Sequence, residues 1–95
     1  MLYKFYIGLN DKDEHIQVIS NATAIKIIKK EFIAATITLG FGIWMDEVEP
    51  CLVVDIIDSS ANESNILNKM DVIKEKLNQD CIMMVKFDTL KEELI

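Results

Sequence analysis

Arginine is absent from this 95-residue chain, and all ten of its basic side chains are lysines. Sixteen acidic residues bring the formal net charge to −6. Arginine makes the bidentate contacts to phosphates and base edges, so both the charge and the residue type disfavour direct DNA or RNA binding. A negative surface suits a basic partner, and it also keeps a small apolar protein in solution.

Proline and glycine are also scarce, and no hydrophobic run is long. The chain has one proline and three glycines, while 51% of it is hydrophobic and fifteen residues are isoleucine. This composition is too apolar for a disordered chain, and no run approaches the roughly 18–20 residues of a membrane helix. The first residues alternate like a strand and lack the features of a signal peptide. We therefore expect a single domain over residues 1–95, cytoplasmic and without membrane contact.

Histidine and cysteine are too few for most metal or nucleophile sites. His15 is the single histidine and lies beside a polar loop, where a surface role is commoner than a catalytic one. Cys51 and Cys81 lack CxxC spacing and a nearby histidine, so neither a zinc site nor a Cys–His nucleophile is indicated. Because cytosolic thiols stay reduced, we expect two free thiols within the chain, with a bridge between chains left open. No metal and no cofactor is predicted.

Acidic residues crowd one predicted turn, Asp46–Pro50, which contains Asp46, Glu47 and Glu49. Paired carboxylates can perform acid–base chemistry or bind Ca²⁺. A solvated turn is the preferred explanation, because the segment lacks the glycine of a calcium-binding loop. The chain shows no nucleophile–base pair, so an enzyme ranks third among the functions considered below.

Hydrophobic periodicity predicts four strands and two helices. The strands are expected at Leu2–Leu9, Ala34–Met45, Cys51–Ile57 and Cys81–Phe87. The first helix is expected at Asn21–Phe32, with Ser20 as its N-cap. The second helix should begin at a capping box of Ser60 and Glu63 and end near Asn78.

The element order βαββαβ defines the expected architecture. Right-handed crossover connections place both helices on one face of an antiparallel sheet with strand order 4-1-3-2. The fold class is therefore α+β, a two-layer ferredoxin-like sandwich. Its second and third strands form a hairpin of unusual length for so small a domain. Residues 88–95 could add a short terminal helix.

Such a sandwich leaves one face of its sheet open. The odd-numbered residues of Ala34–Met45 are all apolar, so we expect them to face the helices, with the even-numbered residues on the open face. The last strand would add Ile82, Met84 and Lys86 to the open face, or else the opposite set; the charge of Lys86 favours the first choice. The other residues expected on the open face are Lys4, Tyr6, Gly8, Thr36, Thr38, Gly40, Gly42, Trp44, Cys51, Val53 and Asp55.

The open face is the predicted functional surface. It is half apolar and includes the single tryptophan, which favours an interface. Asp55 is a charge in a central apolar strand, so it needs a partner, Lys4 or Lys86, or else a ligand. The predicted ligand- or partner-binding residues are Tyr6, Thr36, Thr38, Trp44 and Asp55. We expect a homo-oligomer, dimer or trimer, with the hairpin and an interface built from Gly40, Gly42, Trp44 and Val53.

Three segments carry a resemblance to known proteins: Gly40-Phe41-Gly42-Ile43-Trp44, Glu49-Pro50-Cys51-Leu52-Val53-Val54-Asp55-Ile56-Ile57 and Leu77-Asn78-Gln79-Asp80-Cys81-Ile82. Their pattern, together with the opening residues 3–9, resembles small proteins of phages, prophages and low-GC bacteria. The pattern is a glycine-spaced strand ending in an aromatic, then Glu-Pro before apolar residues, then a helix ending in Gln and an acid. The resemblance implies a ferredoxin-like fold and a phage or mobile-element origin, but no activity. Cys51 and Cys81 stand where the pattern more often has serine, which weakens a catalytic role for a thiol.

The architecture also resembles trimeric signalling and metal-tolerance proteins with a ferredoxin-like core, which bind nucleotides or metal between subunits. Their glycine-rich phosphate loops are not evident here, so this analogy rests on fold alone. Our leading hypothesis is a non-enzymatic oligomeric anti-defence protein that sequesters or masks a basic host protein or a small signalling molecule. The alternative is a sensor that binds a small ligand or nucleotide between subunits.

Overall fold

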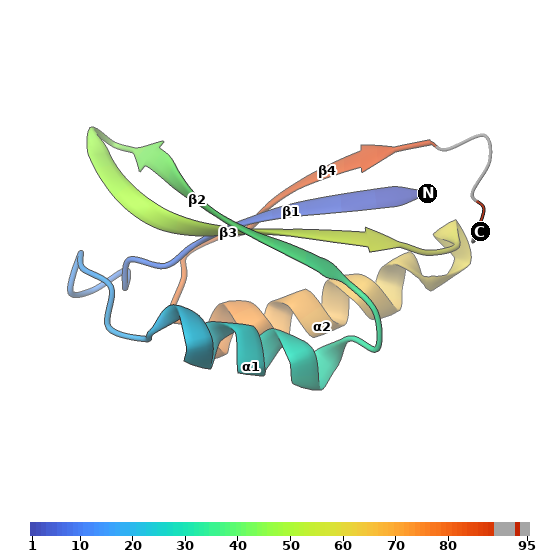
Figure 1. Ribbon diagram of the computed structural model, residues 1–95, viewed down its shortest axis with the longest axis horizontal. Helices are drawn as coiled ribbons and strands as arrows, with labels where there is room; N and C mark the ends of the chain where they lie inside the picture. The colour runs from blue at the N-terminus through green and yellow to red at the C-terminus, as the bar shows by residue number, and fades with distance from the viewer. Residues whose placement is uncertain (89–92, 94–95) are drawn as a thin grey trace.

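The computed structural model describes residues 1–88 and residue 93. Four antiparallel strands form one sheet in the order β2-β3-β1-β4, and both helices lie on one side of it (Figure 1). This confirms the predicted α+β sandwich, because the observed order is 4-1-3-2 read from the opposite edge. The elements are β1 (Leu2–Gly8), α1 (Asn21–Glu31), β2 (Thr36–Trp44), β3 (Glu47–Ile57), the 3₁₀ turn η1 (Ser60–Asn62), α2 (Glu63–Lys76) and β4 (Met83–Phe87). The predicted terminal helix over 88–95 falls mostly outside the described residues.

Helix α1 begins where the sequence predicts. The Ser20 hydroxyl accepts a hydrogen bond from the Thr23 backbone N–H at 3.2 Å, which satisfies one free donor of the first turn. The helix buries Ala24 and Ile28 and ends at Glu31, one residue earlier than predicted. Among the described residues, no helix is long and apolar enough to cross a membrane.

The start of α2 differs from the prediction, and the capping box of Ser60 and Glu63 is wrong. A 3₁₀ turn comes first, with Ser59 as its N-cap, and α2 begins only at Glu63. Asp58 accepts hydrogen bonds from the Asn62 side chain at 2.9 Å and from the Ser59 N–H at 2.7 Å. These bonds favour the charged carboxylate and lower the pKa of Asp58. Asp58 and Ser59 therefore cap the 3₁₀ turn, where the Ser59 hydroxyl accepts from the Ala61 N–H at 3.2 Å, and α2 itself has no side-chain cap.

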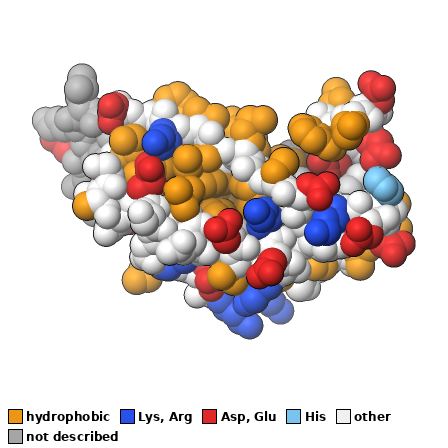
Figure 2. Space-filling model, turned by 180° about the vertical axis from the view of Figure 1, so that it is seen from behind, with side chains coloured by type: hydrophobic (Ala, Val, Ile, Leu, Met, Phe, Trp, Pro, Cys, Tyr) orange, Lys and Arg blue, Asp and Glu red, His pale blue; other side chains and the backbone are white. Residues whose placement is uncertain are grey.

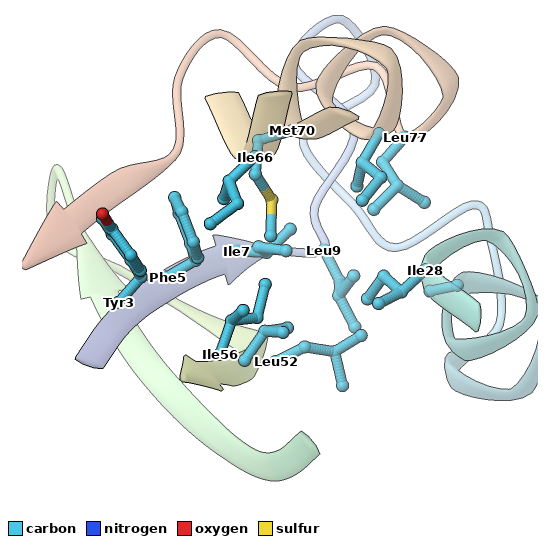
Figure 3. Packing of buried hydrophobic residues seen from close by; sticks show 13 residues of the cluster. Tyr3, Phe5, Ile7, Leu9, Ile28, Leu52, Ile56, Ile66, Met70 and Leu77 are labelled. Carbon is cyan, nitrogen blue, oxygen red and sulfur yellow. The ribbon is translucent and has the colours of Figure 1, made fainter. Parts of the chain in front are cut away.

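The core lies between β1, β3 and the two helices (Figure 3). Strand β1 is central, and its odd-numbered residues pair with even-numbered residues of β3. Six paired side chains are at most 4% exposed: Tyr3, Phe5, Ile7, Leu52, Val54 and Ile56. Ile66 and Met70 of α2 and Ile28 of α1 cover them (Figure 3). Burial of each large apolar side chain is worth about 1.5–3 kcal/mol, so this cluster determines which way β1 and β3 face.

Strand β4 faces the opposite way from the favoured prediction. Its register pairs Met84 with Phe5 and Lys86 with Tyr3, so both residues lie on the helix side of the sheet. Met83, rather than Met84, lies on the open face. The Lys86 ammonium reaches α2, where its Nζ lies 3.2 Å from a Glu63 carboxylate oxygen. A lysine can lie on the helix-facing side of an edge strand because its long aliphatic side chain lets the ammonium group reach solvent and a charged partner.

The hairpin turn is much shorter than the predicted Asp46–Pro50. Only Met45 and Asp46 form it, with φ angles of 48° and 65°, as in the two-residue turns that suit strand twist. Strand β3 therefore begins at Glu47 and includes Pro50. The Pro50 carbonyl accepts from the Leu9 N–H at 2.9 Å. In an antiparallel strand the N–H and the carbonyl of one residue point to the same side. The nitrogen of Pro50 therefore points toward Leu9 and away from β2, so the lack of an N–H at Pro50 removes no hydrogen bond between β2 and β3.

The hairpin extends beyond the helices (Figure 1). The odd-numbered residues of β2 do face the helix side, as predicted, but only Ile37 packs against the core. Leu39, Phe41 and Ile43 are 56%, 80% and 78% exposed, and Val48 of β3 is 65% exposed. The prediction that helices cover this whole face is wrong for the distal half of the hairpin, which leaves an apolar surface bare.

Candidate functional site

One end of the sheet carries a cleft of about 410 Å³ on the open face. The curled hairpin end forms one wall, while the loop after β1 and the segment before β4 form the other. Figure 2 shows the hairpin end as a lobe of hydrophobic and acidic side chains beside a hollow. The volume lies within the range typical of small-molecule sites. We call this space the hairpin cleft.

The five predicted binding residues all lie on the open face, as the register of β1, β2 and β3 shows. Only Tyr6 and Trp44 line the hairpin cleft. Thr36, Thr38 and Asp55 lie farther along the strands, with Thr36 paired to Asp55. The structure therefore brings together the two aromatics of the predicted set, and the binding role of all five stays a prediction.

The predicted interface residues Gly40, Gly42, Trp44 and Val53 also share the open face. Gly42 and Trp44 line the hairpin cleft, whereas Gly40 and Val53 lie outside it. A bare apolar area of the hairpin, formed by Leu39, Phe41, Ile43 and Val48, lies on the other face of the same strands. Half of the predicted interface residues therefore belong to the cleft, and the other half lie on the open face of the sheet outside it.

Asp55 has one of its two predicted partners. The Lys4 ammonium lies 3.2 Å from Oδ1 of Asp55, and the two residues are directly opposite in the β1–β3 register. Lys86, the other candidate, lies on the far face of the sheet. Oδ1 is shielded from solvent and makes no hydrogen bond of good geometry, so the contact is an ion pair. This ion pair accounts for the charge without a ligand.

Glu49 is the site residue that the sequence reading missed. Its Oε2 accepts a hydrogen bond from the Asn10 backbone N–H at 3.0 Å, and its carboxylate lies against Gly8 of β1. The sequence alone predicts it to be one acid of a solvated turn. The signal that could have found it is strand alternation, because Glu49 lies two residues before Cys51 and so shares its open face.

Side-chain amides hold the second wall of the cleft together. Gln79 Nε2 donates to the Asn10 carbonyl at 2.8 Å. Asn78 Nδ2 donates to Asp11 at 2.8 Å and to Asp13 at 2.9 Å. The bond from Asn78, together with nearby backbone N–H groups, lowers the pKa of the Asp11 carboxyl. Two segments more than sixty residues apart in sequence are thereby fixed side by side.

Charge and aromatic surface meet in the hairpin cleft. Its acidic side chains outnumber its lysine: Asp11, Glu47, Glu49 and Asp80 line it with Lys12. Tyr6 and Trp44 supply ring faces, which attract cations and stack on planar groups. Such a cleft is suited to a small ligand that carries a positive charge and an aromatic ring.

The Cys51 thiol is not an activated nucleophile. Burial raises the pKa of the Cys51 thiol, and the neighbouring Glu49 charge raises it further, so the thiol stays protonated at neutral pH. Cys81 is exposed and lies before β4, which begins at Met83 rather than at Cys81 as predicted. Both cysteines are free, as predicted. No cluster of three His, Cys, Asp or Glu able to hold a metal ion is found within the described part of the chain.

Comparison with known proteins relates this fold to a phage enzyme. No protein-family model matches the chain, and no curated protein sequence matches it. Among solved structures, a phage SAM lyase in the apo state is similar, with a TM-score of 0.68 and 18% sequence identity. The match covers 87% of this chain and 75% of that chain. At this identity the likeness shows a shared fold, and it agrees with the resemblance to phage proteins.

Proposed function

We propose that this protein binds S-adenosylmethionine (SAM) in the hairpin cleft and breaks it down as a lyase. The observation that carries the proposal is that Trp44 and the Glu49 carboxylate line the same cleft, on a fold shared with a phage SAM lyase. The sequence predicts a small signalling ligand without naming it, and the alternative hypothesis places that ligand between subunits. This proposal names the ligand as SAM and places it in the hairpin cleft of a single chain.

The ligand's chemistry matches the lining of the cleft. SAM carries an adenine ring, a sulfonium, an ammonium and a carboxylate, so its net charge is positive. Stacking of a base on an aromatic side chain is worth about 1–3 kcal/mol, and Trp44 and Tyr6 offer such faces. Glu49 offers the opposite charge, and the net charge of −6 adds a long-range attraction that salt weakens.

A sulfonium brings its own leaving group to the reaction. When a carbon–sulfur bond of SAM breaks, the electron pair goes to sulfur and a neutral thioether departs. The carbon that loses sulfur bonds at the same time to SAM's own carboxylate oxygen, so that a lactone forms and no outside nucleophile is used. The protein then needs to bind and orient the substrate rather than to supply a nucleophile. The protonated thiol of Cys51 is compatible with this chemistry.

A second candidate is that the protein retains SAM without cleaving it, which is the non-enzymatic sequestration hypothesis. The fixed carboxylate of Glu49 favours it. If Glu49 lies beside the sulfur, its attraction to the positive charge weakens as the bond breaks, so it stabilises the bound substrate more than the transition state. Beside the ammonium group the same carboxylate would favour both states equally.

Chromatography of SAM incubated with the purified protein separates the two candidates. SAM in buffer alone is the control, because it decays slowly by itself. Conversion to a neutral thioether nucleoside above that background is the expected result. Saturable binding without conversion would overturn the lyase and support retention. No binding up to about 1 mM, the upper end of ordinary substrate affinities, would overturn both.

The predicted homo-oligomer, dimer or trimer, remains part of the proposal. Its best support is the bare apolar surface of the distal hairpin, which monomers seldom expose. A phage or mobile-element origin, an anti-defence role and a cytoplasmic location are proposed with it. A basic host protein is the alternative partner, supported by the acidic surface, and would bind at the same end of the molecule.

A further inference from the structure

We propose that Gly8, Asn10 and Gln79 are positioning residues that hold Glu49 in place, so that the hairpin cleft selects ligands by their positive charge. This inference rests on the proposed function, because it concerns the same cleft. The proposed function rests on the shared fold and on the presence of Trp44 and Glu49 in one cleft. The inference adds the reason why that cleft would distinguish charged from neutral ligands.

Gly8 is required for space rather than for backbone conformation. None of the described glycines has a positive φ, so any residue could adopt the backbone of Gly8. A Cβ added there would overlap the carboxylate carbon and both oxygens of Glu49. On a strand, the diagonal neighbour of Glu49 would ordinarily fill this space with a side chain. The missing side chain lets the carboxylate lie directly on β1.

The Asn10 peptide then fixes the carboxylate from the other side. Its N–H donates to Oε2 of Glu49 at 3.0 Å, and its carbonyl accepts from Gln79 at 2.8 Å. Gln79 also donates to the Leu77 carbonyl at 3.2 Å, which ties it to the end of α2. The order of contacts is therefore Leu77, Gln79, Asn10, Glu49, and it runs from the helix layer to the floor of the cleft.

A carboxylate held in this way keeps its charge facing the cleft when no ligand is present. Its orientation does not have to be established at the moment of binding, so more of the electrostatic attraction appears as affinity. A cationic ligand gains from this arrangement, whereas a neutral nucleoside of similar shape does not. The cleft should therefore prefer SAM to 5′-methylthioadenosine, which keeps the adenine and the ribose but carries neither cation.

The test uses G8A, which moves the Glu49 carboxylate without removing it. The group that must move is the far end of a flexible side chain, so the strand should keep its place. The matched control is G40A, which adds the same methyl group to the same face where nothing lies within 4 Å. The affinity of each variant for SAM is taken as its KM where SAM is turned over and as a calorimetric Kd where it is not. Calorimetric titration gives the Kd for 5′-methylthioadenosine, and a thermal melt reports folding.

We expect G8A to weaken SAM about tenfold and to leave 5′-methylthioadenosine unchanged, while G40A binds both like the wild type. E49Q keeps the shape and the hydrogen-bond acceptor but removes the charge, so it should match G8A. In an E49Q background, G8A should have no further effect, because the two act through one group.

Three results would overturn the inference: an unchanged preference for SAM in G8A, an equal loss for both ligands, or losses that add in the double variant. Should G8A melt at a much lower temperature, Q79A takes its place, with a loss that must again vanish in the E49Q background. A wild-type protein that binds no SAM would refute the proposed function itself. That outcome is distinct from binding with an unchanged preference, which refutes only the positioning.

Discussion

The carboxylate of Glu49 on β3 lies directly against Gly8 on β1, in the space that a side chain at Gly8 would fill. The two residues are forty-one positions apart in sequence and meet because β1 and β3 pair with Gly8 opposite Cys51. This contact places a fixed negative charge on the floor of an aromatic cleft. The predictions below separate that charge from the surfaces around it.

Removing the indole of Trp44 should weaken SAM binding by about fivefold to about 150-fold, the equivalent of roughly 1–3 kcal/mol of stacking. W44A should fold normally, because Trp44 is 57% exposed. W44F, which keeps a ring face, should lose less. The KM for SAM, or a calorimetric Kd where SAM is not turned over, measures the effect, because both variants lack the chain's single tryptophan as a fluorescent reporter. Unchanged affinity in W44A would show that the hairpin cleft is not the binding site.

The distal hairpin should drive self-association through its bare apolar face. Phe41 is 80% exposed, so F41S should convert the expected dimer or trimer to a monomer with little change in the melting temperature. Ile33 is fully exposed but lies just before β2, at the opposite end of the hairpin from Phe41, and it supplies the control variant I33S. Sedimentation velocity measures the mass. A monomeric wild type, or an F41S protein that still assembles, would contradict this prediction.

The pair of Asn78 and Asp11 should make stability depend on pH in a defined direction. Hydrogen bonding lowers the pKa of Asp11 in the folded protein, so its contribution is present above the ordinary aspartate pKa of about 3.9 and is lost as pH falls through the lowered value. N78G removes the amide while allowing the positive φ of 49°. Its melting temperature should fall below that of the wild type at pH 7, and the difference should shrink under acid conditions. A constant difference at every pH would contradict it.

Asp55 should matter for stability rather than for the ligand. D55N removes the charge that pairs with Lys4 at 3.2 Å and should cost up to about 1 kcal/mol, the usual range for a partly exposed pair. SAM affinity should stay unchanged, because Asp55 does not line the hairpin cleft. Chemical denaturation and titration measure the two effects. A large loss of affinity would restore the sequence-based prediction that Asp55 contacts the ligand.

Strand alternation explains how much of the fold could be predicted. The unbroken apolar faces of β1, β2 and β3 predict which side of each strand meets the helices, and the structure confirms all three. Strand β4 carries apolar residues on both faces, so a single lysine decided the prediction. Lys86 faces the helices because its charge pairs with Glu63 of α2. The pattern of residues along the strand does not reveal such a contact with a helix.

The candidate site was only partly predictable, because its contacts join distant segments. Tyr6 and Trp44 follow from the facing of their strands. Glu49 does not, since the acids and Pro50 together read as a loop, whereas a two-residue turn at Met45 and Asp46 keeps Glu49 in the sheet. Its hydrogen bond to Asn10 spans thirty-nine positions, and periodicity carries no information about such a pairing.

The central claim is that SAM occupies the hairpin cleft, and amide NMR of the labelled protein titrated with SAM tests it most directly. The account predicts saturable shifts concentrated at the amides that surround the cleft, above all Gly8, Asn10, Gly42 and Gln79, together with the Trp44 indole N–H. Shifts centred instead on the exposed faces of α1 and α2, or no shifts at all, would contradict it.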